Sequence, residues 1–560
     1  MKRLLPLAVI LLLAGFLRFY NISFLPNGLH WDEQDTGYQA LSAFTTGKDY
    51  FGNPIPLFFH SFADFRTPVF IYSAVPSVAV FGLTPFAVRL PSAIFGLLSV
   101  LLIYLLSGLI FRNSKLVIRN FAGLSLAISP WHVQYGRQSV ECNAMLTFIL
   151  LGLVTFYKGL KNPGWLWVSG VGFGLAIASY SPAKMFVPLL VLSLAIIYRF
   201  QLLSLPRKPI LVFVSCFLLL SLPIVIDGFF GQSGTRFHDV SIFTDPTLAS
   251  EVDYQRQFSG AASGREVKIG QSPRFVDKVV YNKPQSIIST FTSNYLNVFS
   301  TQYLFTRGDQ ELRHSPNRNA IGQFHLPEVV TFIFGLFCLG TAKFINKKEA
   351  YLIAFWLLVG PIPSSLTRDG GAHAARTFLL LPAFILTISL GANYLFSKFR
   401  PLFLIYIVFL LFSGLNIFTY FFGTYRFESS RPFQWGFDKV INLALENSAK
   451  YSLVVVDLKN DSPLMAYLFT TRLPPAEFQT LLPLPVKTLT TGVSGNQFGN
   501  ILLLSPGSRN WTNIMAEKNF PKDTLIISDA SQPLIDTQTI HQDSLLYPDM
   551  SPFLYSFVSK

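Results

Sequence analysis

The residues best suited to chemistry lie near the N-terminus, in the stretch HWDEQDTGY that begins at His30 and ends at Tyr38. This stretch follows the hydrophobic run from Leu4 to Tyr20, which is long enough to begin a membrane helix. Asp32, Glu33 and Asp35 put three carboxylates in four positions, which is costly beside a membrane. We interpret Asp32 and Glu33 as the catalytic edge of a membrane enzyme. A solvated loop that carries charges by chance is the alternative.

Composition indicates a polytopic membrane protein. Only 13% of the 560 residues are charged and 51% are hydrophobic, whereas a soluble protein carries about 25% charged residues. The net charge of +14 does not indicate a nucleic-acid partner, because Lys and Arg lie mostly in short gaps between apolar runs. The three scattered cysteines provide neither metal-ligand spacing nor a disulfide framework.

The basic residues predict the topology. Lys2 and Arg3 place the N-terminus in the cytoplasm, and alternation then gives about 11 transmembrane helices with the C-terminus outside. The predicted spans are residues 4–20, 88–111, 120–130, 143–157, 165–179, 185–198, 210–226, 326–342, 350–362, 377–396 and 402–422. Val69 to Leu83 is apolar but short and contains Pro76, and counting it as a span would invert the later loops. We therefore predict a juxtamembrane or re-entrant helix on the outer side.

The chain divides into two domains. Residues 1–427 form an all-α transmembrane domain, with outer loops at 21–87, 131–142, 227–325 and 363–376. In residues 428–560 short β-rich runs alternate with helix-like stretches, which predicts an extracytoplasmic α/β domain. We expect a multi-pass protein of the cell membrane, and the role of its second domain stays open between acceptor binding and structural support.

The polar residues of the outer loops lie near helix ends, at one face of the membrane. We expect substrate contacts from Asp64, Arg66, Arg137, Lys184, Arg318, Arg368, His373 and Arg376, and the same face carries Glu141, Arg313 and His314. A few carboxylates among many cations suit a site that is reached from both lipid and water. Arg137 and Glu141 also have the spacing of a helical salt bridge, and Asp64 could equally cap a helix.

This mixture of residues suits transfer of a sugar from a polyprenyl phosphate. The phosphate leaving group needs cations that neutralise its developing charge. The acceptor hydroxyl needs a general base, which a carboxylate can supply. A glycosidase would instead need two opposed carboxylates at a defined separation, and the sequence has neither a serine-nucleophile motif nor a zinc-binding His-Glu-x-x-His helix.

The ordered motifs resemble the GT-C glycosyltransferases. This superfamily includes the protein O-mannosyltransferases, the aminoarabinose transferase of lipid A and a rhizobial glycosyltransferase group. The Trp31-Asp32-Glu33 element resembles the Asp-Glu motif that follows their first helix. Further similar stretches within about residues 1–400 are 81–93, Ser129-Pro130-Trp131-His132 with Arg137 and Glu141, and Thr367-Arg368-Asp369-Gly370.

The resemblance implies inverting transfer from a polyprenyl-phosphate sugar to a glycan, lipid or protein acceptor at the outer face. Asp32 would be the general base, Glu33 would orient it or contact the acceptor, and Glu141 corresponds to an acid of the second outer loop. Some members of the superfamily use a divalent metal, but the sequence shows no complete ligand set, so metal dependence stays open. The alternatives are a glycan ligase or polymerase with a pyrophosphate-linked lipid donor, a lipid or sugar transporter, and an inactive scaffold.

Overall fold

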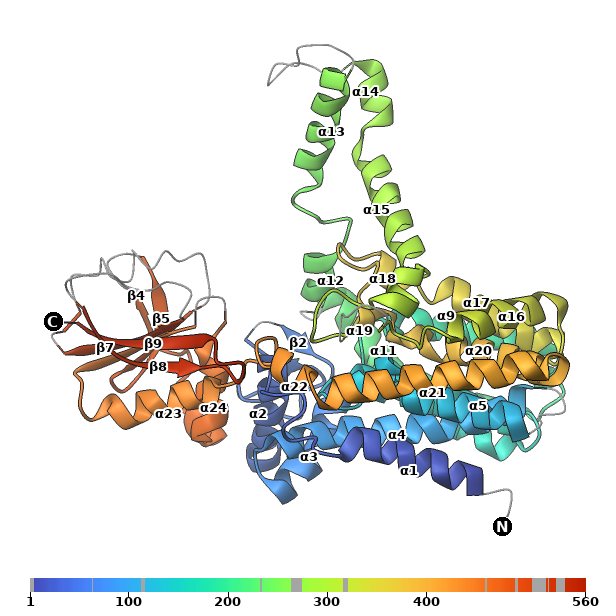
Figure 1. The fold of residues 1–560 in the computed structure, drawn as a ribbon, viewed down its shortest axis with the longest axis horizontal. Coiled ribbons are helices and arrows are strands. Elements are labelled where there is room, and N and C mark those ends of the chain that lie inside the picture. The colour runs from blue at the N-terminus through green and yellow to red at the C-terminus, as the bar shows by residue number, and fades with distance from the viewer. Residues whose placement is uncertain are drawn as a thin grey trace.

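Long apolar helices lie side by side along one axis and form the larger part of the molecule, and a sheet domain sits at one end of them (Figure 1). The computed structural model describes residues 5–62, 64–111, 116–231, 234–262, 274–315, 321–458, 461–488, 492–505, 520–521, 523–529 and 539–559.

A helix coincides with each predicted membrane span. These helices are α1 (Leu5–Phe19), α4 (Pro85–Ile110), α5 (Leu116–Ile128), α7 (Cys142–Gly159), α8 (Leu166–Ile177), α9 (Ala183–Ile197), α11 (Arg207–Phe230), α16 (Glu328–Thr341), α17 (Lys347–Val359), α20 (Leu381–Lys398) and α21 (Arg400–Phe422). Within the described ranges, five helical segments are long and apolar enough to cross a membrane by length and composition: 85–110, 142–159, 207–228, 374–398 and 400–422. The helical membrane architecture is confirmed, and the count of eleven crossings stays a prediction.

Several predicted outer loops contain helices. The helix α3 (Pro68–Phe81) coincides with the predicted juxtamembrane segment, whereas α2 (Trp31–Thr46) carries the acidic stretch itself. The expected loop 131–142 begins as α6 (Pro130–Tyr135), because Ser129 accepts the His132 N–H as an N-cap and Pro130 suits the first helical position.

The remaining elements of the helical domain are short or lie in the long outer segment. They are β1 (Phe59–His60), β2 (Phe65–Arg66), η1 (Pro163–Trp165), α10 (Arg199–Leu203), α12 (Thr235–Val240), α13 (Leu248–Ala262), α14 (Phe275–Val280), α15 (Lys283–Asn297), η3 (Gln302–Thr306), α18 (Ile362–Ser365), α19 (Ala374–Thr377), η4 (Phe378–Leu380) and α22 (Tyr425–Glu428).

Three of the connections predicted to be cytoplasmic lie together at the end of the bundle remote from α2. Phe111 forms a β-bridge with Ile345, which brings the α4–α5 and α16–α17 connections together. The Lys348 ammonium donates to Gln201 Oε1 at 3.2 Å, which brings the segment after α9 to the same end of the bundle. Basic residues therefore cluster at one end of the bundle, as the positive-inside rule requires of the cytoplasmic face.

The C-terminal domain is an α/β sheet domain, as the sequence predicts. Its seven strands have the order β4-β5-β6-β3-β7-β9-β8, and β3 pairs in parallel with both β6 and β7. Every residue of β3 is buried, as expected for a central parallel strand. The elements are α23 (Phe437–Ser448), β3 (Leu453–Asp457), α24 (Pro463–Thr471), α25 (Pro475–Thr480), β4 (Val486–Thr488), β5 (Ser494–Phe498), β6 (Ile501–Leu504), β7 (Thr524–Asp529), β8 (Thr539–Leu546) and β9 (Pro552–Ser559).

The C-terminal domain shares a hydrophobic core with α2. Tyr38 and Tyr50 are buried in one cluster with Val440, Val454 and Leu464. Hydrogen bonds add to this packing: the Tyr38 hydroxyl donates to the Leu473 carbonyl at 2.8 Å, and the Gln479 amide donates to the Asp49 carbonyl at 2.8 Å. The helix that carries the acidic stretch is therefore held by both domains.

The clustering of basic loops generates a topology prediction. In a background without the native cysteines, we expect Thr480→Cys, exposed on α25, to react with a membrane-impermeant maleimide on intact cells. Lys161→Cys, exposed in the loop after α7, should react only after permeabilisation, because its loop belongs to the basic end. The opposite labelling pattern would invert the assignment of the two faces.

Candidate functional site

The acidic stretch forms the first turn of α2, with His30 as its N-cap. The His30 imidazole accepts the Asp32 N–H at 3.2 Å, and the Glu33 carboxylate accepts the His30 N–H at 3.3 Å, which together form a capping box. Carboxylates in this first turn also interact favourably with the helix dipole. Gly37 permits the close packing that follows, since a Cβ there would lie 2.7 Å from Val88 and 2.9 Å from Phe469.

A buried arginine of α4 fixes the start of α2. Arg89 donates to both oxygens of Glu33 at 2.9 Å, and to the carbonyls of Ile22, Pro26 and Gly28 at 2.6–3.0 Å. Glu33 Oε1 also accepts a backbone N–H of the loop after α6 at 2.9 Å. All of the acceptor capacity of Glu33 is therefore engaged, and this carboxylate positions the helix. Glu33 also lines the polar pocket described below.

Arg137 fixes the preceding turn in the same way. Its guanidinium donates to the carbonyls of Leu17, Tyr20 and Leu25 at 2.7–3.2 Å and is fully buried. Arg137 does not pair with Glu141, as a helical salt bridge would require. It also does not line the pocket described below. Its predicted contact with substrate stays untested, and its observed role is to hold the α1–α2 connection.

A second buried network lies behind Asp32. Arg66 donates to Asp35 at 2.8 Å, to Glu141 at 3.1 Å and to the Asp32 carbonyl at 2.9 Å. Asp35 also accepts from the Tyr50 hydroxyl at 2.6 Å. Burial disfavours the Arg66 charge, but the three carboxylates outweigh it and raise the pKa of Arg66. Asp35 and Glu141 are thereby held in ion pairs with Arg66.

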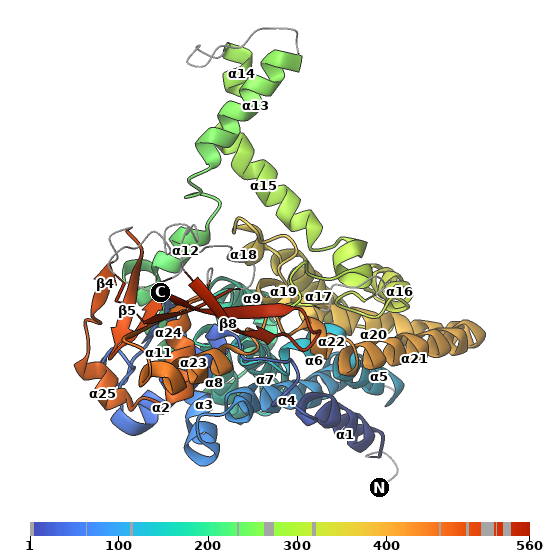
Figure 2. The same ribbon diagram turned by 60° about the vertical axis from the view of Figure 1, so that its left-hand side comes forward.

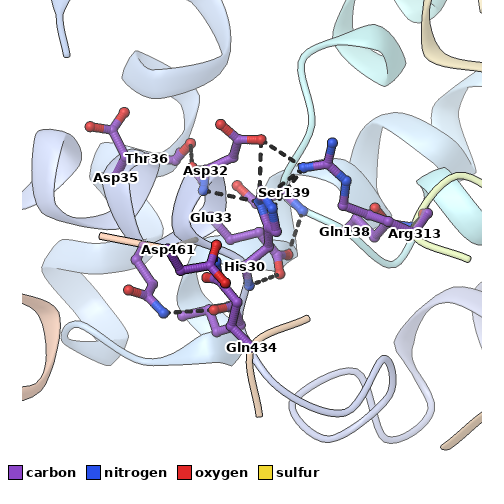
Figure 3. A network of polar contacts seen from close by, with 12 residues as sticks. His30, Asp32, Glu33, Asp35, Thr36, Gln138, Ser139, Arg313, Gln434 and Asp461 are labelled. Carbon is purple, nitrogen blue, oxygen red and sulfur yellow. Dashed lines mark hydrogen bonds and ion pairs between the residues drawn. The ribbon is translucent and has the colours of Figure 1, made fainter. Parts of the chain in front are cut away.

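Asp32 is the most exposed of the four carboxylates. Its side chain is 35% exposed, against 3% for Glu33, 0% for Asp35 and 15% for Glu141. One oxygen accepts from Arg313 Nη1 at 3.0 Å and lies 3.3 Å from His30 Nδ1 (Figure 3). Burial opposes its ionisation, but the His30 hydrogen bond and the nearby positive charges outweigh this effect and lower the pKa of Asp32. The carboxylate is therefore ionised at neutral pH.

Asp32 opens into a polar pocket of about 130 Å³. Six separate parts of the chain meet there, and the chemically relevant lining residues are His30, Asp32, Glu33, Tyr135, Glu141, Tyr180, Arg313, His314, His373, Arg376 and Phe433. A larger apolar cavity of about 330 Å³ lies between α1, α5 and α21, but His325 is the one ionisable residue in its lining. The polar pocket is consequently the candidate active site.

Three of the residues near this pocket could hold a metal ion. Ligand atoms of Asp309, His314 and His373 lie within 4.8 Å of one another. Asp309 lies 3.0 Å from His314 Nδ1, and the buried Nδ1 of His373 has no hydrogen-bond partner among the described residues. Burial and the charge of Arg376 lower the pKa of His373 to about 3, which leaves its imidazole neutral and able to bind a metal. One carboxylate with two imidazoles suits zinc and similar divalent ions.

Other residues predicted to bind substrate lie away from the pocket. Asp64 accepts the neighbouring Phe65 N–H at 2.6 Å, and Lys184 lies over the Phe58 ring at 4.7 Å. Arg368 pairs with Asp245 at 3.9 Å. Arg318 is outside the described residues. Of the basic residues predicted to bind substrate, His373 and Arg376 line the pocket. Arg376 is paired with Asp369 at 2.5 Å.

The sequence did not single out several residues that matter here. In the sequence, Arg313 and His314 are two among many outer-loop charges. The fold brings Arg313 to Asp32 and His314 to His373, which are far away along the chain. Arg89 has a readable signal, because a charged residue within an apolar run must have a buried partner. His132, in the Ser129-Pro130-Trp131-His132 stretch, is fully buried with Arg18 Nη2 at 2.6 Å from its Nδ1.

Comparisons with known proteins match part of this chain to one protein family. Residues 66–226 match the family described as dolichyl-phosphate-mannose-protein mannosyltransferase. YkcB of Bacillus subtilis (strain 168), a candidate mannosyltransferase, is 30% identical over 179 residues. That alignment covers 30% of this chain and only 23% of YkcB.

Solved structures extend the likeness to the whole chain. ArnT from Cupriavidus metallidurans, bound to undecaprenyl phosphate, is similar with a TM-score of 0.53, and its apo state has a TM-score of 0.51. Both comparisons cover 99% of this chain and 97% of ArnT, at 13% identity, so they show the fold. The chain therefore has the fold of ArnT, and its residues 66–226 match the mannosyltransferase family.

Proposed function

We propose that this protein transfers a sugar from a polyprenyl phosphate to a hydroxyl group of an extracytoplasmic acceptor, with inversion at the anomeric carbon. One observation carries the proposal: a partly exposed, ionised carboxylate, Asp32, lines one polar pocket together with Arg313, which it contacts, and Arg376. The ArnT structure with bound undecaprenyl phosphate supports a lipid-phosphate donor for this fold.

Asp32 would act as the general base. It accepts the proton of the incoming hydroxyl while that oxygen attacks the anomeric carbon on the face opposite the phosphate. The phosphate leaves as an anion, so no general acid is needed. A carboxylate with a lowered pKa is a weak base, but it is always ionised at neutral pH, and the attack itself makes the hydroxyl proton more acidic.

The cations of the pocket would bind the donor phosphate. Arg376 and Arg313 can each donate charge-assisted hydrogen bonds to phosphate oxygens, and these bonds strengthen as negative charge develops on the leaving group. Arg313 also contacts Asp32, so it would couple the position of the phosphate to that of the base. His30 lies 3.3 Å from the same Asp32 oxygen and would help to hold it in place.

We further propose a divalent metal at Asp309, His314 and His373. These residues would hold the ion, which when bound would add positive charge beside the departing phosphate. His314 and His373 line the same pocket as Asp32, so these residues would hold the ion at that pocket.

The test of the reaction class is direct. Purified protein in proteoliposomes is incubated with labelled polyprenyl-phosphate sugars and an extract of acceptor lipids, glycans and proteins. Transfer from a monophosphate donor supports the proposal. Transfer only of a preassembled chain from a pyrophosphate-linked lipid would indicate a ligase or polymerase instead.

The proposed role of Asp32 predicts a loss of turnover when its carboxylate is replaced by an amide. Asp32→Asn keeps the shape of the side chain but removes its basicity, so we expect turnover to fall about 10²–10⁴-fold with donor binding retained. The matched control is Glu311→Gln, which neutralises an exposed carboxylate that lies 3.7 Å from the same Arg313. Near-normal turnover in Asp32→Asn would make Glu141 the leading candidate for the base.

The position of the arginines predicts that Arg376 and Arg368 behave differently. Arg376→Ala removes a phosphate contact in the pocket, and we expect donor affinity to weaken by about 1.5–3 kcal/mol. Arg368→Ala, beside Asp245 and away from the pocket, should leave donor affinity unchanged. Donor titration of the two variants in one preparation checks this difference, and an equal loss in both would contradict it.

Metal content tests the proposed ligand set without an activity assay. We expect protein loaded with zinc or manganese and then desalted to retain bound metal, and His314→Ala to lose it. His238→Ala, an exposed imidazole on α12, is the matched control and should keep the wild-type content. Equal metal content in the two variants, or none in the wild type, would refute the site.

A further inference from the structure

A helical hairpin projects from the outer end of the bundle, with α13 as one arm and α14 and α15 as the other (Figures 1 and 2). At its base the Tyr295 hydroxyl donates to the Leu358 carbonyl at 2.7 Å, and Asn294 donates to the Thr367 carbonyl at 2.8 Å. Thr367 begins the loop that leads to His373 and Arg376. The hairpin therefore leaves the bundle at the same end as the polar pocket.

The direction of the hairpin places it along the membrane surface. In both views its arms run across the long apolar helices α4 and α21 rather than beside them. Transmembrane helices lie near the bilayer normal. A hairpin that crosses their direction consequently extends parallel to the membrane plane.

The tip of the hairpin exposes an apolar face. In α14 the side chains of Phe275, Val276, Val279 and Val280 are 81%, 65%, 59% and 46% exposed. Their spacing places all four on one side of the helix, and Asp277 and Lys278 fall on the other. On the opposite arm, Tyr254 and Phe258 are each 65% exposed and stack with ring centroids 6.3 Å apart.

This exposure is typical of the membrane-facing parts of the chain. Leu219 of α11 and Phe412 of α21, on long apolar helices, are 77% and 72% exposed, much like Phe275. In the described part of residues 431–560, by contrast, aromatic side chains are buried or only partly exposed. A group of six large apolar side chains that are 46–81% exposed indicates a surface that contacts something other than water.

Basic residues flank the apolar tip. Arg274 precedes α14, Lys278 lies within it and Lys283 begins α15. On the facing arm, Arg256 donates to the Tyr281 carbonyl at 2.9 Å, which ties the two arms together. Cations beside an inserted apolar face suit the phosphates of lipid headgroups, and this pattern is characteristic of helices that lie in a membrane interface.

We propose that the hairpin of α13, α14 and α15 is an interfacial membrane anchor whose α14 face inserts into the outer leaflet. The occupant of the apolar face is the bilayer, with phosphate headgroups at the flanking cations. The anchor would fix the orientation of the outer loops against the membrane surface, beside the pocket. This inference does not depend on the proposed glycosyl transfer.

Site-specific fluorescence tests the anchor. Val276→Cys within the apolar face and Asp277→Cys outside it, about 100° away around α14, are labelled with an environment-sensitive dye in a background without the native cysteines. Each is reconstituted in nanodiscs with and without doxyl-labelled phospholipid, and Glu477→Cys on the exposed face of α25 serves as the water-facing reference. Only variants with the thermal stability of the wild type are compared, and Val279→Cys replaces Val276→Cys if that variant does not fold.

We expect the label at residue 276 to show blue-shifted emission and loss of fluorescence with doxyl-labelled lipid, and the label at residue 277 to show both effects more weakly. Emission at residue 276 that matches the reference and is unaffected by the labelled lipid would overturn the proposal. A blue shift that is insensitive to the labelled lipid and depends on two copies per nanodisc would also overturn it, because the apolar face would then contact a second copy of the chain.

Discussion

The buried pairing of Arg89 with Glu33 is the interaction on which the candidate site depends. Removing two charges from water is costly, and it is tolerated only when every hydrogen-bonding group is satisfied. Here Arg89 also donates to three carbonyls of the α1–α2 connection, and Glu33 also accepts two backbone N–H groups. Loss of one partner from such a pair typically costs about 3–5 kcal/mol. The pair therefore fixes where α2 begins, and with it the position of Asp32.

The same principle assigns different roles to neighbouring acids of similar chemistry. Glu33, Asp35 and Glu141 each have an arginine partner in the protein interior, so their charges maintain structure. Asp32 is paired at the pocket surface and keeps an exposed edge, so it can meet a substrate. The C-terminal domain contributes to this arrangement because α2 packs on it, and Phe433 of the segment that leads into the domain lines the pocket. The shared core gives the second domain a structural role.

The membrane architecture could be predicted from sequence because lipid imposes a simple pattern: apolar runs of sufficient length, separated by basic loops. The apolar segment at residues 68–81, which forms a helix, and the α/β character of the C-terminal domain followed from equally local signals. The site was only partly predictable. Asp32, His373 and Arg376 line the pocket, but Arg313 and Asp309 come from a long loop whose path is determined by tertiary contacts. Arg137 and Arg66 carry the charge expected of a phosphate-binding residue, yet they are engaged by backbone carbonyls and carboxylates that no sequence spacing reveals.

The most direct measurement is an experimental structure of the protein bound to a polyprenyl phosphate. We expect phosphate oxygens within hydrogen-bond distance of Arg313 or Arg376, with the Asp32 carboxylate open to the pocket and Glu33 still paired with Arg89. A phosphate bound at Arg368, or a Glu33 carboxylate released from Arg89 and turned toward the ligand, would contradict the assignment of Asp32 as the reactive acid.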